Sequence, residues 1–196
     1  MKRIFTFTTI GLVVLILVVY PGFAKKYFNS PFLEKVERTP PLEEGAAGTV
    51  ENKTTYKDPL ISVTWNPEPT AFYFTLTNLS GENFEIIWSE CYLKDSFSKY
   101  TVIHEGMKYP REISPTRLPA GKNLRDFMYP TAFVKYERSG RISNLRYKGI
   151  YKKKLKEKEV ADNAFVPETF VVTLTLTAGD NRYAYEFHFK TELEEK

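Results

Sequence analysis

The residues best suited to acid–base chemistry open an irregular, proline-rich stretch in the middle of the chain. His104 and Glu105 begin it, and Tyr109 and Arg111 follow closely. A histidine beside a carboxylate can transfer protons, because imidazole titrates near neutral pH. A single histidine at the end of a strand more often caps or hydrogen-bonds that strand, and we interpret His104 in this way. Catalysis is the alternative, and it requires the loop to meet a carboxylate such as Asp126 in a closed pocket.

The other histidine and the single cysteine lack the neighbours that metal binding or nucleophilic catalysis needs. His188 shares the polar face of an expected strand with Glu186 and Lys190, so we expect it to face solvent. Cys91 follows Glu90, but a thiol nucleophile needs a base from another element, and we expect Cys91 to be a buried apolar residue. Two histidines and one cysteine without close spacing predict no zinc site. Phosphate-loop, nucleophile-elbow and zinc-protease motifs are also missing, so the sequence predicts no catalytic, cofactor-binding or metal-binding residues.

Residues 135–159 form a strongly basic segment. Ten basic residues stand against three acidic ones, so this segment carries +7 in a chain whose net charge is +4, and the remainder is net −3. Lysines and arginines mixed with tyrosines are typical of surfaces that bind anionic polymers or lipid headgroups. The candidate contact residues are Arg146, Lys148, Lys152, Lys153, Lys154 and Lys156. The alternative is a solvated surface loop.

The N-terminal stretch has the pattern of an export signal. Lys2 and Arg3 precede an uncharged, apolar run over residues 4–24. Small residues at the end of this run, in 21–24, fit cleavage by signal peptidase after Ala24. The same run is long enough to cross a bilayer as an uncleaved transmembrane helix. We therefore expect a periplasmic protein, or one anchored in the inner membrane with its domain outside the cytoplasm.

Composition limits the compartment and the partners. One cysteine excludes an intramolecular disulfide, and an exported protein without disulfides is typical of the bacterial envelope. No cysteine follows the apolar run, so lipid attachment is not expected. The net charge of +4 is too small to indicate a nucleic-acid partner.

Two stretches predict β-hairpins, because apolar and polar side chains alternate on both sides of a turn. They are residues 71–88, with a break at 78–83, and residues 170–189, with a turn at 178–181. We expect Trp88 to be a core residue. Together with the shorter alternating runs, they predict an all-β fold, an antiparallel immunoglobulin-like sandwich of about seven or eight strands. A closed barrel is the alternative fold.

The expected domain organisation follows from these patterns. Residues 1–24 are a signal peptide or signal anchor, which forms a hydrophobic helix, and residues 59–191 are the β-sandwich domain. Proline, glycine and scattered charges predict a flexible linker over residues 25–58. Residues 192–196 are expected to be a charged, solvated tail.

Five short motifs carry a resemblance to known proteins. They are Phe74-Thr75-Leu76-Thr77-Asn78, Ile86-Ile87-Trp88, Val102-Ile103-His104-Glu105-Gly106, Leu118-Pro119-Ala120-Gly121 and Tyr185-Glu186-Phe187-His188-Phe189. Over roughly residues 70–190 the chain resembles small bacterial exported proteins and lipoproteins that have an immunoglobulin-like fold and no assigned activity. The resemblance implies the fold and the envelope setting, and it implies no functional residue.

These observations favour a membrane-tethered or periplasmic binding or structural module of the bacterial envelope, without catalysis. Its expected partner is an envelope protein or an anionic lipid or glycolipid. The alternatives are an exported hydrolase-type enzyme that uses the His104 loop, and adhesion to anionic surfaces through residues 135–159.

Overall fold

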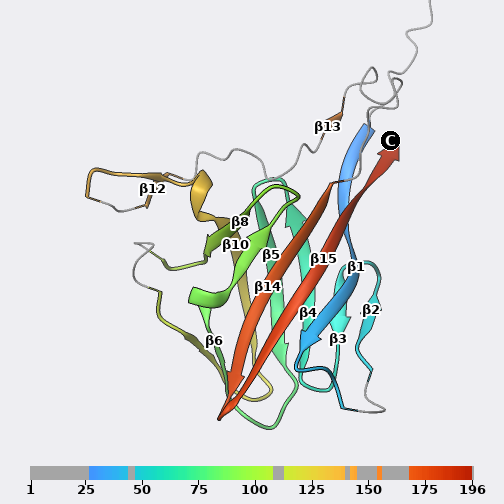
Figure 1. Ribbon diagram of the computed structural model, residues 1–196, viewed down its shortest axis with the longest axis vertical. Helices are drawn as coiled ribbons and strands as arrows, with labels where there is room; N and C mark the ends of the chain where they lie inside the picture. Colours follow the sequence, from blue (N-terminus) through green and yellow to red (C-terminus); the bar gives the residue numbers. More distant parts are fainter. Residues whose placement is uncertain are drawn as a thin grey trace, which may run out of the picture.

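The computed structural model describes residues 27–43, 47–107, 113–139, 142–144, 154–155 and 168–195. These residues form an antiparallel, all-β fold dominated by one curled sheet (Figure 1). The strands are β1 (Tyr27–Thr39), β2 (Thr49–Glu51), β3 (Thr55–Lys57), β4 (Ile61–Glu68), β5 (Ala71–Asn78), β6 (Phe84–Ile86), β7 (Tyr92–Lys94), β8 (Lys99–Ile103), β9 (Thr116–Leu118), β10 (Asn123–Pro130), β11 (Lys135–Tyr136), β12 (Ile142–Asn144), β13 (Lys154–Leu155), β14 (Thr169–Ala178) and β15 (Asn181–Glu195). Two short 3-10 helices, η1 (Trp88–Glu90) and η2 (Thr131–Phe133), interrupt them.

The main sheet has the order β13-β1-β15-β14-β7-β8-β10-β5-β4-β3-β2, while β6 pairs with β14 and β9. β11 and β12 form a separate two-stranded sheet. The all-β, antiparallel class predicted from the sequence is therefore confirmed for the described residues.

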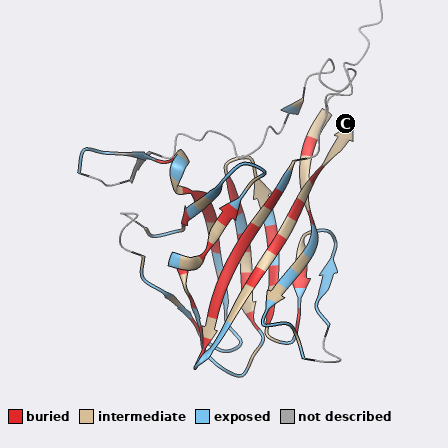
Figure 2. Cartoon of the chain, in the orientation of Figure 1, coloured by how far each residue is buried: buried red, intermediate tan, exposed pale blue. Residues whose placement is uncertain are grey.

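The β14–β15 hairpin confirms the expectation for residues 170–189. Phe170 lies opposite Phe189, and the ladder continues to Ala178 opposite Asn181. Gly179 opens the turn with a φ of +54°, in the left-handed region that favours glycine. Figure 2 shows buried residues running along both strands. Local alternation and turn chemistry are enough to specify this pair.

The hairpin predicted for residues 71–88 is wrong in its pairing. β5 pairs with β4 and β10, whereas β6 pairs with β14 and β9. The buried Asn78 directs the chain away from β5: its Nδ2 donates to the carbonyls of Glu82 (2.7 Å) and Leu118 (3.0 Å), and its Oδ1 accepts from the Ser80 amide (3.0 Å). Residues 78–83 therefore connect two parts of the sheet and do not close a tight hairpin.

Aromatic packing across the interior accounts for the curl of the sheet. Trp65 on β4 packs against Phe187 and Phe189 on β15, with ring centroids 4.9 and 5.5 Å apart. Five strands separate β4 from β15 in the hydrogen-bonded order, so the sheet has to bend for these rings to meet. The two ends of the strand order also meet. The amide of Leu33 on β1 donates to the carbonyl of Lys53 in the β2–β3 turn (2.7 Å). The edge formed by β2 and β3 thus returns to β1.

The prediction of a flexible linker over residues 25–58 is wrong for most of its length. β1 pairs with β15 from Tyr27 opposite Glu195 to Thr39 opposite Ala184, and β2 and β3 follow it. Leu33 is buried in the core. β1 is stable because its backbone pairs along the long strand β15, a contribution that a local count of apolar residues does not include.

The domain boundaries change accordingly at both ends. β1 belongs to the β domain, and the tail expected at 192–196 is part of β15 as far as Glu195. The N-terminal helix expected within residues 1–24 lies outside the described residues. Within the described parts of the chain, no helix has both the length and the apolar character needed to span a membrane.

Candidate functional site

The structure brings His104 and Asp126 together at the end of β8. His104 follows the last residue of β8, and Asp126 lies on β10, which pairs with β8 through Tyr129 opposite Ile103. The His104 Nδ1 atom lies 3.3 Å from Asp126 Oδ2, and the side chains are 12% and 5% exposed. The contact that the alternative, an exported enzyme, requires between His104 and a carboxylate is therefore present.

Backbone amides fix the Asp126 carboxylate. Its Oδ1 accepts hydrogen bonds from the amides of Glu105 and Phe127, each 2.7 Å long. These bonds tie the start of the His104 loop to β10. The carboxylate thus has a structural role that is independent of any proton transfer.

The indole of Trp88 fixes the plane of the imidazole. The rings of Trp88 and His104 are stacked, with centroids 3.9 Å apart and 4° between their planes. Trp88 Nε1 donates to Thr116 Oγ1 at 2.7 Å, which orients the indole in turn. Trp88 is buried, as its assignment to the core predicted. Its contact with His104 was missed, because no sequence spacing links η1 to the end of β8.

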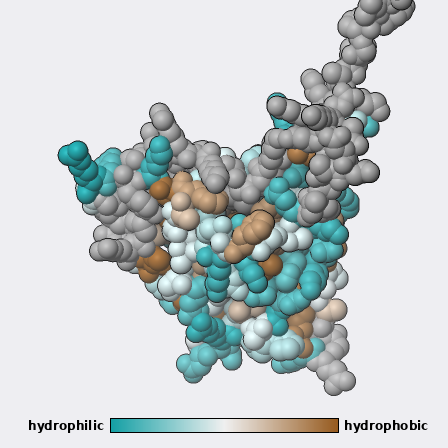
Figure 3. Space-filling view, turned by 45° about the horizontal axis from the view of Figure 1, so that its top comes forward, coloured by the Kyte–Doolittle hydropathy of each residue, from teal (hydrophilic) through white to brown (hydrophobic). Residues whose placement is uncertain are grey.

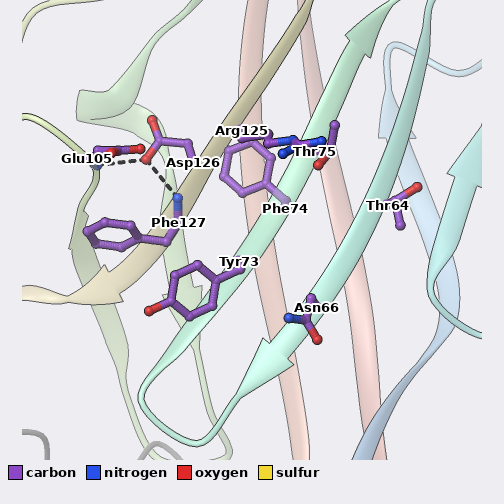
Figure 4. Close-up of a pocket in the computed structure, with 9 residues that line it drawn as sticks. All are labelled: Thr64, Asn66, Tyr73, Phe74, Thr75, Glu105, Arg125, Asp126 and Phe127. Atoms are coloured by element: carbon purple, nitrogen blue, oxygen red, sulfur yellow. Dashed lines mark hydrogen bonds between the residues drawn. The ribbon is translucent and has the colours of Figure 1, made fainter.

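Two surface depressions flank this contact and share Glu105. One, of about 310 Å³, is lined by His104, by Thr116 at the start of β9, and by the loop residues Glu105, Gly106, Met107, Ser114 and Pro115. The other, of about 410 Å³, lies over β4, β5 and β10. It is lined by Thr64, Asn66, Tyr73, Phe74, Thr75, Glu105, Arg125, Asp126 and Phe127 (Figure 4). Glu105 and Ser114 are exposed, so among the described residues of this loop the first depression is open, whereas the catalytic alternative requires a closed pocket.

The larger depression combines aromatic rings with charged groups. The Tyr73 and Phe127 rings lie side by side in Figure 4, with centroids 5.8 Å apart. Arg125 lies further along the same face, and Glu105 lies beside Asp126 (Figure 4). Such a surface can hold a polar ligand by ring contact and charge.

The first depression contains a histidine and a serine, the residue types of a hydrolytic site, but no hydrogen bond between these two side chains is seen in the described residues. His104 and Ser114 both line it. Within the described part of the chain, Asp126 is the only side chain hydrogen-bonded to the His104 imidazole. A serine nucleophile needs its hydroxyl within hydrogen-bond reach of the base. The arrangement supports orientation of His104 more directly than it supports nucleophilic catalysis.

The remaining predicted loop residues and the cysteine have separate outcomes. Tyr109 and Arg111 lie outside the described residues. Cys91 is buried, as predicted. Burial is the main reason that its pKa is raised to about 12, with the charge of Glu90 adding to the rise and the Thr175 amide opposing it. The thiol is therefore protonated at neutral pH and unsuited to nucleophilic attack.

Only one of the six candidate residues of the basic segment is described. Lys154 lies on β13, exposed, and pairs with Phe28 at the start of β1. Arg146, Lys148, Lys152, Lys153 and Lys156 lie outside the described residues. The structure thus places one point of the segment, next to the end of β1 that follows the N-terminal apolar run.

His188 lies in a cluster that the sequence did not indicate. It is 21% exposed, and its Nε2 atom lies 3.7 Å from Glu37 Oε1 and 3.9 Å from Glu186 Oε2. Glu186 was expected beside His188 because residues two apart on one strand point to the same face. Glu37 could not be expected there, because its segment gave no strand signal.

Comparison of the chain with protein-family models, with curated proteins and with solved structures finds no match.

Proposed function

We propose that this protein is a non-catalytic binding or structural module of the bacterial envelope, held at a membrane by residues 4–24 or released into the periplasm. One observation carries the proposal. β1 begins at Tyr27, three residues after Ala24, and is paired with β15 from its first residue. If the apolar run stays in a bilayer, the β domain is held directly at the bilayer surface. The long linker that would let it move away is absent from the described residues.

The end of the domain that contains the start of β1 and the end of β15 projects beyond the rest of the sheet and can act as a spacer, which supports the proposal. Lys190 lies opposite Thr169, the first residue of β14, and β15 continues to Glu195. These five further residues, paired with β1, extend the β1–β15 ribbon by roughly 16 Å at about 3.3 Å per residue. An anchored protein would have this ribbon between the bilayer and the rest of the sheet.

An exposed aromatic side chain lies in the turn that contacts the first residue of β14, where the spacer begins. Phe97, in the turn between β7 and β8, is 92% exposed. Asp95 Oδ1 accepts from the amides of Phe97 and Ser98, both at 2.7 Å, and Ser96 Oγ lies 3.4 Å from Thr169 Oγ1. Where described residues are visible in Figure 3, hydrophobic groups are scattered among hydrophilic ones and form no continuous patch. Contact with an envelope partner through single exposed side chains fits this surface better than burial in the membrane interior.

Fractionation of cells that make the full chain tests the proposal. Carbonate-resistant membrane association with Met1 retained supports the anchored form, and a periplasmic product beginning at Lys25 supports the released form. The Ala24→Tyr variant is the matched control, because a large residue before the scissile bond blocks signal peptidase. Recovery in the cytosol with Met1 retained and no membrane association contradicts the envelope assignment.

An exported hydrolase is the second candidate, and the 3.3 Å contact between His104 and Asp126 favours it. Ser114 is then the candidate nucleophile, because it lines the same depression as His104. A fluorophosphonate probe distinguishes the candidates, since it labels activated serines. Labelling that is lost in both Ser114→Ala and His104→Gln variants would support the enzyme. No labelling of the wild type supports a binding module.

The immunoglobulin-like sandwich and the resemblance to small exported proteins also remain proposals. Packing of Trp65 on β4 against Phe187 on β15 supports the sandwich, because two parts of the curled sheet then face one another across a shared core. The continuous strand order and the Leu33–Lys53 hydrogen bond between β1 and the β2–β3 turn fit the alternative, a closed barrel. A crystal structure in which strand pairing runs all the way round would favour the barrel.

A further inference from the structure

The side chains of Glu37, Glu186 and His188 converge on the outer face of the β1–β15 ribbon. Glu37 lies directly opposite Glu186 in the antiparallel register. His188 is two residues beyond Glu186 on the same strand, so both side chains point to one face. Tyr185, Phe187 and the other alternate residues point into the core. Two neighbouring strands thus supply one imidazole and two carboxylates to one place.

We infer that Glu37, Glu186 and His188 bind a divalent first-row transition-metal ion such as zinc. One ligand atom from each residue lies within 4.8 Å of the other two, and the His188 Nε2 distances to Glu37 Oε1 and Glu186 Oε2 are 3.7 and 3.9 Å. Two ligands bound tetrahedrally to zinc at about 2.0–2.1 Å are roughly 3.3 Å apart. The imidazole and each carboxylate therefore need to approach by less than about 1 Å, within the range of side-chain rotation.

The environment of the His188 Nε2 atom gives a further reason for a ligand. It is inaccessible to solvent and has no hydrogen-bond partner among the described residues. A buried polar atom without a partner is unfavourable. A metal ion bound to Nε2 removes this cost. It also neutralises the repulsion between Glu37 and Glu186, because like charges directly opposite across a ladder destabilise it.

Neighbouring side chains define which oxygens are free to bind. The Tyr92 hydroxyl donates to Glu186 Oε1 at 2.7 Å, which orients the carboxylate and leaves Oε2 toward His188. Lys35 Nζ lies 2.5 Å from Glu37 Oε1, so its ammonium group competes with a metal for that oxygen. Imidazole with two carboxylates suits zinc, cobalt or nickel better than calcium or magnesium, which prefer oxygen ligands alone. Three protein ligands leave a fourth position for water or a partner.

Cobalt(II) and zinc(II) titrations of the chelator-treated full chain test the inference. We expect one equivalent of metal to bind, with a cobalt visible spectrum of nitrogen and oxygen ligation. His188→Ala should abolish binding, and Glu37→Gln should weaken it at least about tenfold. Lys35→Gln should tighten binding, because it removes the competing cation. Substitution of the other histidine, as His104→Ala, should leave it unchanged.

The competing explanation is that His188 contacts only the two carboxylates, with no metal ion between them. In that case the chain takes up no metal, and the His188 ring resonances do not move when zinc is added. Binding weaker than about 1 mM, or binding that His188→Ala does not change, overturns the inference. Unfolding midpoints of each variant without metal show whether the fold is intact.

Discussion

The indole of Trp88 lies flat on the imidazole of His104, with ring centroids 3.9 Å apart and their planes within 4°. This contact joins η1 to the end of β8. It also orients His104 so that Nδ1 meets Asp126. A core tryptophan thus fixes the imidazole that lines one of the two surface depressions.

Trp88→Ala should lower the free energy of unfolding by roughly 3–5 kcal/mol, the usual cost of emptying a buried aromatic site. Chemical denaturation followed by circular dichroism measures the change. Trp88→Phe is the matched control and should cost less, because it keeps a ring against His104. An unchanged midpoint for Trp88→Ala would place this side chain outside the core.

A buried carboxylate holds two tyrosines in the core, and this arrangement predicts loss of stability at high pH. Asp58 Oδ2 accepts from the hydroxyls of Tyr185 (3.0 Å) and Tyr56 (3.2 Å). Burial, and then the Asp58 charge, raise the pKa of both tyrosines above their ordinary values. The folded state therefore retains the phenol protons more strongly than the unfolded state. This contribution is complete below the unfolded-state pKa and is lost as pH rises above about 10.

Denaturation at several values of pH, with absorbance of tyrosinate, measures this loss. Tyr185→Phe should cost about 1.5–3 kcal/mol at neutral pH, the range for a hydrogen bond to a charged group. It should also flatten the alkaline decline. Tyr73→Phe is the control, because Tyr73 is exposed. A decline of equal slope in Tyr185→Phe and wild type would contradict the role of this cluster.

Leu33 tests whether residues 27–39 belong to the domain. It is 2% exposed and contacts the core, so Leu33→Ala should destabilise the protein by about 2–5 kcal/mol. Glu34→Ala at the exposed neighbouring position should change stability by less than about 0.5 kcal/mol. Equal midpoints for the two variants would be the behaviour of a flexible linker.

The basic segment should bind anionic membranes. Changing Lys152, Lys153, Lys154 and Lys156 to glutamine should weaken binding to phosphatidylserine vesicles by about 1 kcal/mol per charge near the surface. The effect should shrink as salt rises, and the unfolding midpoint should stay the same. A control variant with Lys57, Lys94, Lys99 and Lys122 changed to glutamine removes the same four charges at exposed positions elsewhere. Equal vesicle binding by variant and wild type at low salt would make the segment a solvated loop.

The sequence by itself determined features that depend on neighbouring residues. The alternation from Phe170 to Phe189 with its glycine turn specified the β14–β15 hairpin, and the apolar character of Trp88 and Cys91 agreed with their burial. Strand period and turn conformation are set within a few residues, so a single chain displays them. From the sequence, contact between His104 and Asp126 could be stated only as a requirement for catalysis, because no spacing links the two residues.

Tertiary structure alone decided which strands pair and which distant side chains meet. β5 and β6 follow one another with matching alternation but belong to different ladders, because Asn78 and the aromatic interior favour other partners. Glu37 reaches Glu186 and His188 only because β1 pairs along β15. Pairing energy depends on backbone hydrogen bonds and burial shared between segments far apart in the chain, and no local pattern in either segment contains that information.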